Sequence, residues 1–331
     1  MVCLDLTIPV GLIVSAVGGT PAESWIPRPE FDATHASDAI WKRYHDAVAK
    51  YTPEQSEEYK AELAAWLVQY PTPALQFANS HSHPREPFSP AHSTVPVRLY
   101  NGMIHGLEPY TMKGIVWFQG DGNGQHPEEY PELIKTLIST WRKHFGAELP
   151  FYYAEINNMF TAQTKPVEPG ALPRIREAQN AALELPRTGV VSTIDLGIAE
   201  DAHFPVKQPA GDRMARLVLS EVYGAALGEV HSPQFSSMSI ESNRVRLHFQ
   251  YAGGLKTKDG GPVKGFALRG ADGAWVWAEG KTEGGDVILW NSQAPHPVAA
   301  RYGWAANPAI SIENGAGLPL RPFRTDKESS F

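Results

Sequence analysis

The strongest constraint on the fold is the alternation of apolar, strand-like runs with amphipathic helical segments. Apolar runs at 114–119, 151–156 and 190–196 predict strands, and an earlier run at 8–14 predicts a buried strand of the same sheet. Helical spacing of apolar residues follows at 127–145, 175–183 and 210–223. Strands that alternate with helices predict a parallel sheet, with ligands bound at the carboxyl ends of its strands.

Two more helices are expected between the first and second of these runs. Residues 38–50 place Ile40, Trp41, Tyr44 and Val48 on one face of a helix. Thr52-Pro53-Glu54-Gln55 is a capping box that begins a second helix, which is expected to end near Tyr70. Residues 71–96, rich in Pro, His and Ser, are expected to form a long irregular segment.

The pattern changes near residue 229. Short alternating stretches such as 244–249 are separated by glycine pairs, which is typical of an all-β module. A length of 331 residues suits two domains. We therefore predict an α/β domain over 1–228 and a small β-rich domain over 229–331.

Charge and composition exclude several classes of function. A net charge of −7 gives no basic surface for phosphates, so a nucleic-acid partner is not expected. No apolar run approaches the roughly 20 residues of a membrane span. The single cysteine, Cys3, excludes an intrachain disulfide framework and zinc sites built on several thiolates. The N-terminus lacks the pattern of a signal peptide, which leaves the compartment undetermined.

Asp201 and His203 are the first candidate catalytic pair. They lie two residues apart in the turn after the third expected strand, so both side chains can lie on the same side of an extended loop. A carboxylate beside an imidazole fixes its tautomer and stabilises the imidazolium, as a general base in acyl transfer requires. The alternative is a surface histidine near a solvated aspartate.

Two glycine-rich turns supply candidate oxyanion donors. Gln119 and Asn123 follow the strand at 114–119, and Gly19 belongs to the Gly18-Gly19 turn after the run at 8–14. Side-chain amides and backbone N–H groups in such turns can stabilise a developing oxyanion. The alternative is a pair of ordinary tight turns.

Other reactive side chains give weaker signals. His81 and His83, with His92 and His105, lack a coherent third ligand, so no metal is expected. Serines near expected strand ends lie outside any GxSxG elbow, and Cys3 has no activating histidine beside it. These serines are Ser15, Ser24 and Ser192.

A set of ordered segments resembles the sialate O-acetylesterases, carbohydrate esterases of the SGNH hydrolase superfamily. Residues 113–123 read KGIVWFQGDGN and residues 201–208 read DAHFPVKQ. The other segments that resemble the family are 8–25, 99–105, 141–146, 149–151, 175–179, 194–197, 265–268, 301–305 and 317–326.

The resemblance implies a three-layer, flavodoxin-like α/β domain followed by a small all-β domain. It implies a cofactor-free and metal-free esterase, often secreted or periplasmic, that removes acetyl groups from sialic acid or a related sugar; acetylxylan-type esters are the alternative. By position, His203 and Asp201 become the base and acid of a triad. Gly19 and Asn123 become oxyanion-hole elements, and Gln119 part of the pocket wall.

The sequence departs from the family at two places. The family nucleophile is the serine of a Gly-Gln-Ser-Asn motif on the first strand, and the chain contains no such motif. Gly120-Asp121-Gly122-Asn123 stands where the family commonly has Gly-Glu-Ser-Asn. Three alternatives follow: the chain lacks the first strand of its sheet and leaves an edge unpaired, it is a sugar-binding relative without catalysis, or Ser15 or a water activated by His203 is the nucleophile.

Overall fold

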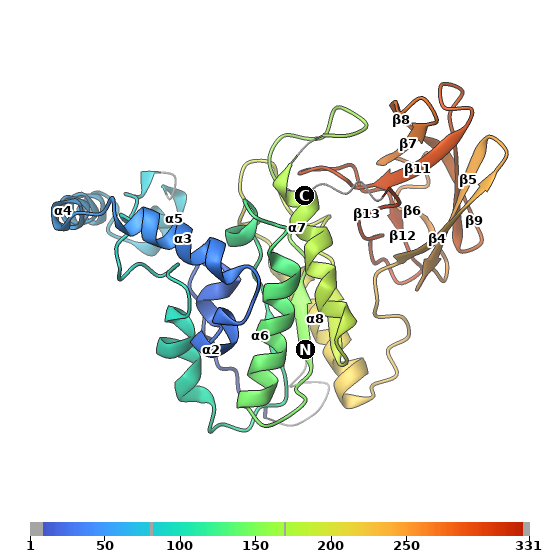
Figure 1. The fold of residues 1–331 in the computed structure, drawn as a ribbon. Coiled ribbons are helices and arrows are strands. Elements are labelled where there is room, and N and C mark those ends of the chain that lie inside the picture. The colour runs from blue at the N-terminus through green and yellow to red at the C-terminus, as the bar shows by residue number, and fades with distance from the viewer. Residues whose placement is uncertain (1–8, 80–81, 169, 327–331) are drawn as a thin grey trace.

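A three-stranded parallel sheet lies at the centre of the first part of the chain. The computed structural model describes residues 9–79, 82–168 and 170–326 (Figure 1). The sheet order is β1 (Ile115–Trp117), β2 (Phe151–Ala154) and β3 (Thr188–Val191). Both pairings are parallel, with Ile115 opposite Phe151 and Tyr153 opposite Val190. The expected strands at 114–119, 151–156 and 190–196 are therefore confirmed, although the third begins two residues earlier and ends five residues earlier than predicted.

Helices cover both faces of this sheet. Successive side chains of a strand point to opposite faces: Phe151 and Tyr153 belong to one buried cluster and Tyr152 to another. The first cluster includes side chains of α6 (Tyr130–His144) and α7 (Ala171–Gln179), and the second those of α8 (Gln208–Tyr223). The flavodoxin-like arrangement of helix, sheet and helix layers is thus present.

A group of helices precedes β1. Figure 1 shows α4 and α5 on the side of the α/β part away from the β-rich module. The predicted capping box of α4 is confirmed, since the Thr52 N–H donates to Gln55 Oε1 at 2.9 Å. The segment at 71–96 is less irregular than expected because α5 forms within it. The elements are η1 (Ala22–Trp25), α2 (Arg28–Asp32), α3 (Ser37–Val48), α4 (Pro53–Gln69), α5 (Pro73–Ala78), η3 (Tyr100–Ile104), η4 (His105–Leu107), η5 (Asp121–Asn123) and η6 (Asn180–Glu184).

The strand predicted at 8–14 is wrong. Ile8 lies outside the described residues, and residues 9–14 form no strand. Leu12 and Val14 are 86% and 85% exposed. An apolar run becomes a strand only where a neighbour satisfies its backbone groups, and in the described part of the chain β1 pairs with β2 alone. Among the described residues β1 is thus an edge strand, and its Val116 is 59% exposed.

The expected all-β region is present from Gln234 onward. Two four-stranded antiparallel sheets, β4-β5-β10-β9 and β13-β11-β7-β8, share one buried cluster that includes Leu247, Phe266 and Tyr302. The division at residue 229 stays a prediction. The strands are β4 (Gln234–Glu241), β5 (Arg244–Gln250), β6 (Lys256–Thr257), β7 (Phe266–Gly270), β8 (Trp275–Trp277), β9 (Glu279–Glu283), β10 (Asp286–Trp290), β11 (Pro297–Tyr302), β12 (Ile312–Glu313) and β13 (Phe323–Arg324).

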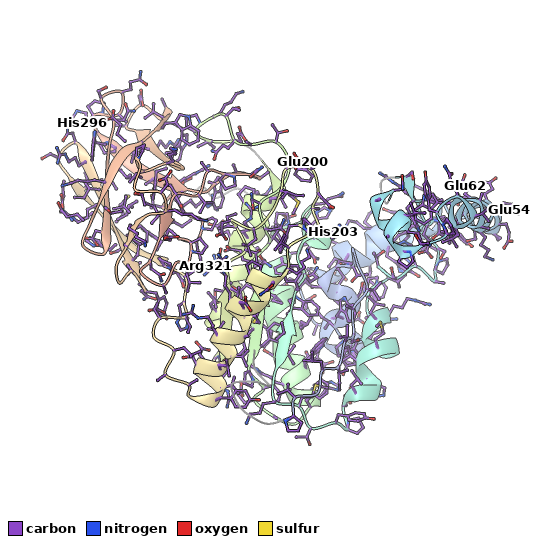
Figure 2. All side chains as sticks on the ribbon, turned by 180° about the vertical axis from the view of Figure 1, so that it is seen from behind. Glu54, Glu62, Glu200, His203, His296 and Arg321 are labelled. Carbon is purple, nitrogen blue, oxygen red and sulfur yellow. The ribbon has the colours of Figure 1, made fainter. Side chains whose placement is uncertain are left out.

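Buried arginines join the β-rich module to the carboxyl end of β2. Arg321 of the module, labelled in Figure 2, donates to Glu155 Oε1 at 3.0 Å. Arg176 of α7 donates to the carbonyl oxygens of Asn157 at 2.6 Å and of Ala305 at 2.6 Å. Because these contacts hold the loop that follows β2, the module braces the sheet edge where parallel sheets bind ligands. Within the described residues, no helix is long and apolar enough to cross a bilayer.

Candidate functional site

The Asn123 side chain is held by hydrogen bonds at the carboxyl edge of the sheet. It is buried, and its Oδ1 accepts hydrogen bonds from the Ala22 N–H and from Gln119 Nε2, both at 2.8 Å. Its Nδ2 donates to Glu23 Oε2 at 2.8 Å. These three bonds fix the orientation of the amide. The Nδ2 group has two hydrogens, and among the described residues one of them makes this bond to Glu23.

The Gly18-Gly19 turn lies next to this amide. Gly19 has a φ of +72°, a conformation that favours glycine. Gln119 Nε2 also donates to the Thr20 carbonyl at 3.1 Å. A Cβ on Gly122 would lie 2.8 Å from that same carbonyl carbon, so the approach of the two turns requires glycine there. The structure therefore brings together the turns that carry Gly19, Gln119 and Asn123.

The Gln119 amide is held from the opposite side by helix residues. Tyr130 of α6 donates its hydroxyl to Gln119 Oε1 at 3.1 Å, and Gln179 of α7 donates to the Gln119 carbonyl at 3.0 Å. Burial raises the pKa of Tyr130, which keeps the hydroxyl a donor. Gln119 thus forms part of a preorganised wall beside Asn123.

His203 and Asp201 lie together on the loop before α8. The His203 N–H donates to Asp201 Oδ1 at 2.7 Å, whereas Nδ1 of the imidazole lies 3.6 Å from the same oxygen, beyond hydrogen-bond range. The His203 side chain is 81% exposed. Figure 2 places it between the β-rich module, which carries His296, and α4, which carries Glu54 and Glu62.

Electrostatics connect this loop with the turn that carries Asn123. Desolvation raises the pKa of Asp121, and the charges of Arg176 and His203 act in the opposite direction. His203 is therefore within electrostatic range of η5. The loop before α8 thus supplies an imidazole and a carboxylate, and the turn that carries Asn123 supplies amide donors.

The serines considered as nucleophiles have other partners. Ser15 Oγ donates to the Met103 carbonyl of η3 at 3.3 Å, and Ser192 Oγ donates to Glu155 Oε2 at 2.7 Å. Ser24 is fully buried, with no hydrogen-bond partner for its hydroxyl among the described residues. No serine in the described ranges is hydrogen-bonded to His203.

The histidines of the segment at 71–96 were considered above as metal ligands. Across the described ranges no group of three His, Cys, Asp or Glu side chains is placed to hold an ion. His83 Nδ1 lies 2.6 Å from the Pro84 carbonyl. His81 and Cys3 lie outside the described residues.

Glu23 was missed by sequence reasoning. Its carboxyl is buried, and this desolvation raises its pKa, although bonds from its own backbone and from Asn123 oppose the shift. Glu23 and Asn123 are 100 residues apart in sequence. No local spacing signals such a contact; only the resemblance of 8–25 to a known family could have drawn attention to it.

Comparisons with known proteins show which proteins this chain resembles. Residues 90–220 match the family model described as a carbohydrate esterase, sialic acid-specific acetylesterase. The sialate O-acetylesterase of Mus musculus is 26% identical over 206 residues, 58% of this chain and 34% of the mouse protein. That of Rattus norvegicus is 27% identical over 207 residues, again 58% of this chain and 34% of the rat protein. The chain thus spans about a third of the length of the curated relatives that it matches.

A solved structure extends the similarity beyond the α/β part. The crystal structure of a carbohydrate acetylesterase from Xanthomonas citri matches with a TM-score of 0.76 and 26% sequence identity. The match covers 98% of this chain and 63% of that protein. The β-rich module is therefore part of the shared architecture.

Proposed function

We propose that this chain, whose residues 90–220 match the family model of a sialic acid-specific carbohydrate esterase, hydrolyses acetyl esters on a sugar. The observation that carries the proposal is the convergence of three bonds on the Asn123 amide, beside the loop of His203. An oriented amide donor and an imidazole on a nearby loop suit acyl transfer, in which an oxyanion must be stabilised and a proton moved. Sialic acid or a related sugar is the proposed substrate.

The proposed mechanism assigns one proton transfer to His203. Its imidazole takes a proton from the nucleophile as the nucleophile adds to the acetyl carbonyl carbon. Asn123 Nδ2 and the backbone N–H of Gly19 stabilise the resulting oxyanion. When the C–O bond to the sugar breaks, the imidazolium returns the proton to the sugar oxygen, and Asp201 stabilises the charged imidazolium meanwhile.

The identity of the nucleophile is the point at which this chain departs from the family. The 331 residues contain no Gly-Gln-Ser-Asn motif, and Ser15 donates to Met103 rather than to His203. For these residues alone we propose that His203 deprotonates water, and that hydroxide adds to the carbonyl carbon and releases acetate directly. A serine in this motif supplied by further chain would replace water in the same geometry.

A second candidate is a sugar-binding relative without catalysis. Two observations favour it: the sequence lacks the family's serine motif, and the His203 imidazole lies 3.6 Å from Asp201 on an exposed loop. A protein that only binds the sugar requires the residues that line the site, but it does not require a general base.

Hydrolysis of 4-nitrophenyl acetate separates the two candidates. We expect the unmodified chain to release nitrophenol faster than buffer, and His203→Ala to lower the rate by about 10²–10⁴-fold, the usual contribution of a general base. His296→Ala is the matched control, because His296 is an exposed histidine of the β-rich module (Figure 2). Absence of turnover in the unmodified chain would favour the binder. Turnover that survives His203→Ala would remove His203 from the mechanism.

A further inference from the structure

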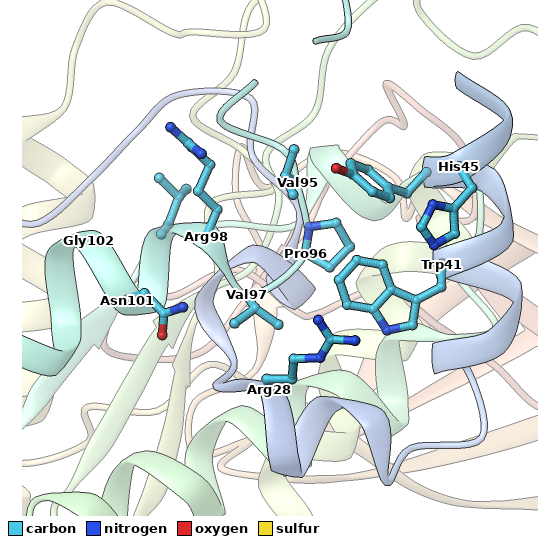
Figure 3. Close-up of a pocket in the computed structure, with 11 residues that line it drawn as sticks. Arg28, Trp41, His45, Val95, Pro96, Val97, Arg98, Asn101 and Gly102 are labelled. Carbon is cyan, nitrogen blue, oxygen red and sulfur yellow. The ribbon is translucent and has the colours of Figure 1, made fainter. Parts of the chain in front are cut away.

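A pocket of about 790 Å³ lies between helices α2 and α3 and the segment that leads into η3 (Figure 3). This volume is in the range of small-molecule sites and accommodates a mono- or disaccharide. Its lining mixes aromatic, apolar and cationic side chains. The lining residues are Arg28, Trp41, Tyr44, His45, Val95, Pro96, Val97, Arg98, Leu99, Asn101 and Gly102.

The charge of this pocket is opposite to that of the whole protein. The chain has a net charge of −7, yet the described residues that line the pocket include two arginines and no carboxylate. Arg28 uses only its Nε to bond Asp32 Oδ2, at 3.0 Å, so that within the described ranges both Nη groups remain free to donate. Arg98 is exposed and has no ion pair in the described part of the chain. The pocket is therefore suited to an anionic ligand.

Asp32 holds Arg28 and Trp41 of the pocket relative to each other. Its Oδ1 accepts a hydrogen bond from Trp41 Nε1 at 2.8 Å, while its Oδ2 holds Arg28. The Arg28 guanidinium carbon lies 4.9 Å from the centre of the Trp41 ring (Figure 3). These two bonds restrain both side chains before any ligand arrives, which reduces the side-chain entropy that binding must remove.

The opposite wall contains a strained residue. Val97 has a φ of +71°, and a β-branched side chain rarely adopts this conformation. Its N–H donates to the Glu23 carbonyl at 2.8 Å, and the Glu23 carboxyl in turn accepts from Asn123. Strain of this kind persists where the surroundings fix it, often at binding sites. The wall is thus tied to the element that positions Asn123.

We propose that this pocket is a second binding site, which holds a sugar that carries a carboxylate. The free Nη groups of Arg28 donate to the carboxylate, since a guanidinium matches that group in a two-pronged geometry. Arg98 adds positive charge at the rim, and the Asn101 amide serves the sugar hydroxyls. Trp41 and Tyr44 supply aromatic surface for the apolar side of the ring. Binding here does not depend on ester hydrolysis.

Titration calorimetry on the full chain tests the site. The probes are N-acetylneuraminic acid, D-glucuronic acid and, as the neutral comparison, N-acetylmannosamine. We expect both acids to bind at least about tenfold more tightly than the neutral sugar, and Arg28→Gln to weaken their binding about tenfold, equivalent to 1.4 kcal/mol. Arg244→Gln is the matched control, because Arg244 also lies over an indole, that of Trp290, at 5.4 Å outside the pocket. It should bind as the unmodified chain does.

Each contrary outcome overturns the proposal. No heat with either acid at about 10 mM would mean that the pocket takes no such ligand. Equal affinity for acids and the neutral sugar would remove the role of the arginines. Acid binding that persists in both Arg28→Gln and Arg98→Gln would place the ligand elsewhere. His203→Ala is expected to keep full binding; if that variant loses it, the acid occupies the ester site instead.

Discussion

The ion pair between Arg321 and Glu155 offers a sharp test of how the β-rich module supports the site. Arg321 donates to Glu155 Oε1 through Nε at 3.2 Å and Nη2 at 3.0 Å, and it also bonds Asn180. The two side chains are 4% and 1% exposed. Burial acts to lower the pKa of Arg321, but the interactions with Glu155 and Tyr153 together outweigh it and raise that pKa, so the guanidinium stays charged.

Replacement of Arg321 by methionine keeps much of its volume and removes its charge. Glu155 would then be left buried, with Ser192 as its remaining side-chain hydrogen-bond partner among the described residues. Removal of one partner of a buried ion pair lowers the free energy of unfolding by about 3–5 kcal/mol. At about 2–4 °C per kcal/mol for a domain of this size, the melting temperature should fall by about 6–20 °C.

Differential scanning calorimetry measures this fall directly. The matched control is Arg246→Met, since Arg246 makes ion pairs with Glu241, Glu283 and Asp286 on the surface of the module. Exposed pairs contribute little, so its melting temperature should hardly change. An unchanged Tm in Arg321→Met, or an equal fall in the control, would refute the reasoning. The double variant Glu155→Gln, Arg321→Met should recover part of the loss, because no buried charge is left unpaired.

Three further predictions concern the turns around Asn123. Asn123→Ala should lower kcat for an aryl acetate by about 10²–10³-fold, and an unchanged kcat would remove the amide from the oxyanion site. Gly122→Ala should destabilise the fold by about 1–3 kcal/mol in urea denaturation, since its Cβ would lie 2.8 Å from the Thr20 carbonyl carbon; Gly106→Ala, with no atom within 4 Å of its Cβ, is the control. The raised pKa of Glu23 means that the folded state binds its proton more tightly than the unfolded state, so stability falls as pH rises above the unfolded pKa. Glu23→Gln should therefore be more stable relative to the unmodified chain at pH 7 than at pH 4, and a pH-independent difference would contradict this.

Local patterns in the sequence were sufficient to predict the sheet and its helices. The apolar run at 114–119 predicts a strand through its hydrophobic pattern. The capping box at Thr52–Gln55 predicts a helix start because it satisfies N–H groups of the first helical turn. The run at 8–14 has the same apolar character but no partner among the described strands. Periodicity reports which residues are apolar; it does not report whether a neighbour is present to pair with.

The candidate site was predictable only in part. The turns that carry Gln119, Asn123 and Gly19 follow from strand ends and glycine chemistry, and the structure brings them together. The role of Glu23 depends on a contact across 100 residues, which a single sequence does not encode locally. The assignment of His203 as the base and Asp201 as its partner stays a prediction.

Acetate release from an O-acetylated sialic acid, followed by proton NMR, tests the central claim most directly. The unmodified chain, His203→Ala and the His296→Ala control are compared at equal concentration. The account predicts acetate release by the unmodified chain and the control, and a loss of about 10²–10⁴-fold in His203→Ala. Equal release by all three proteins would contradict it.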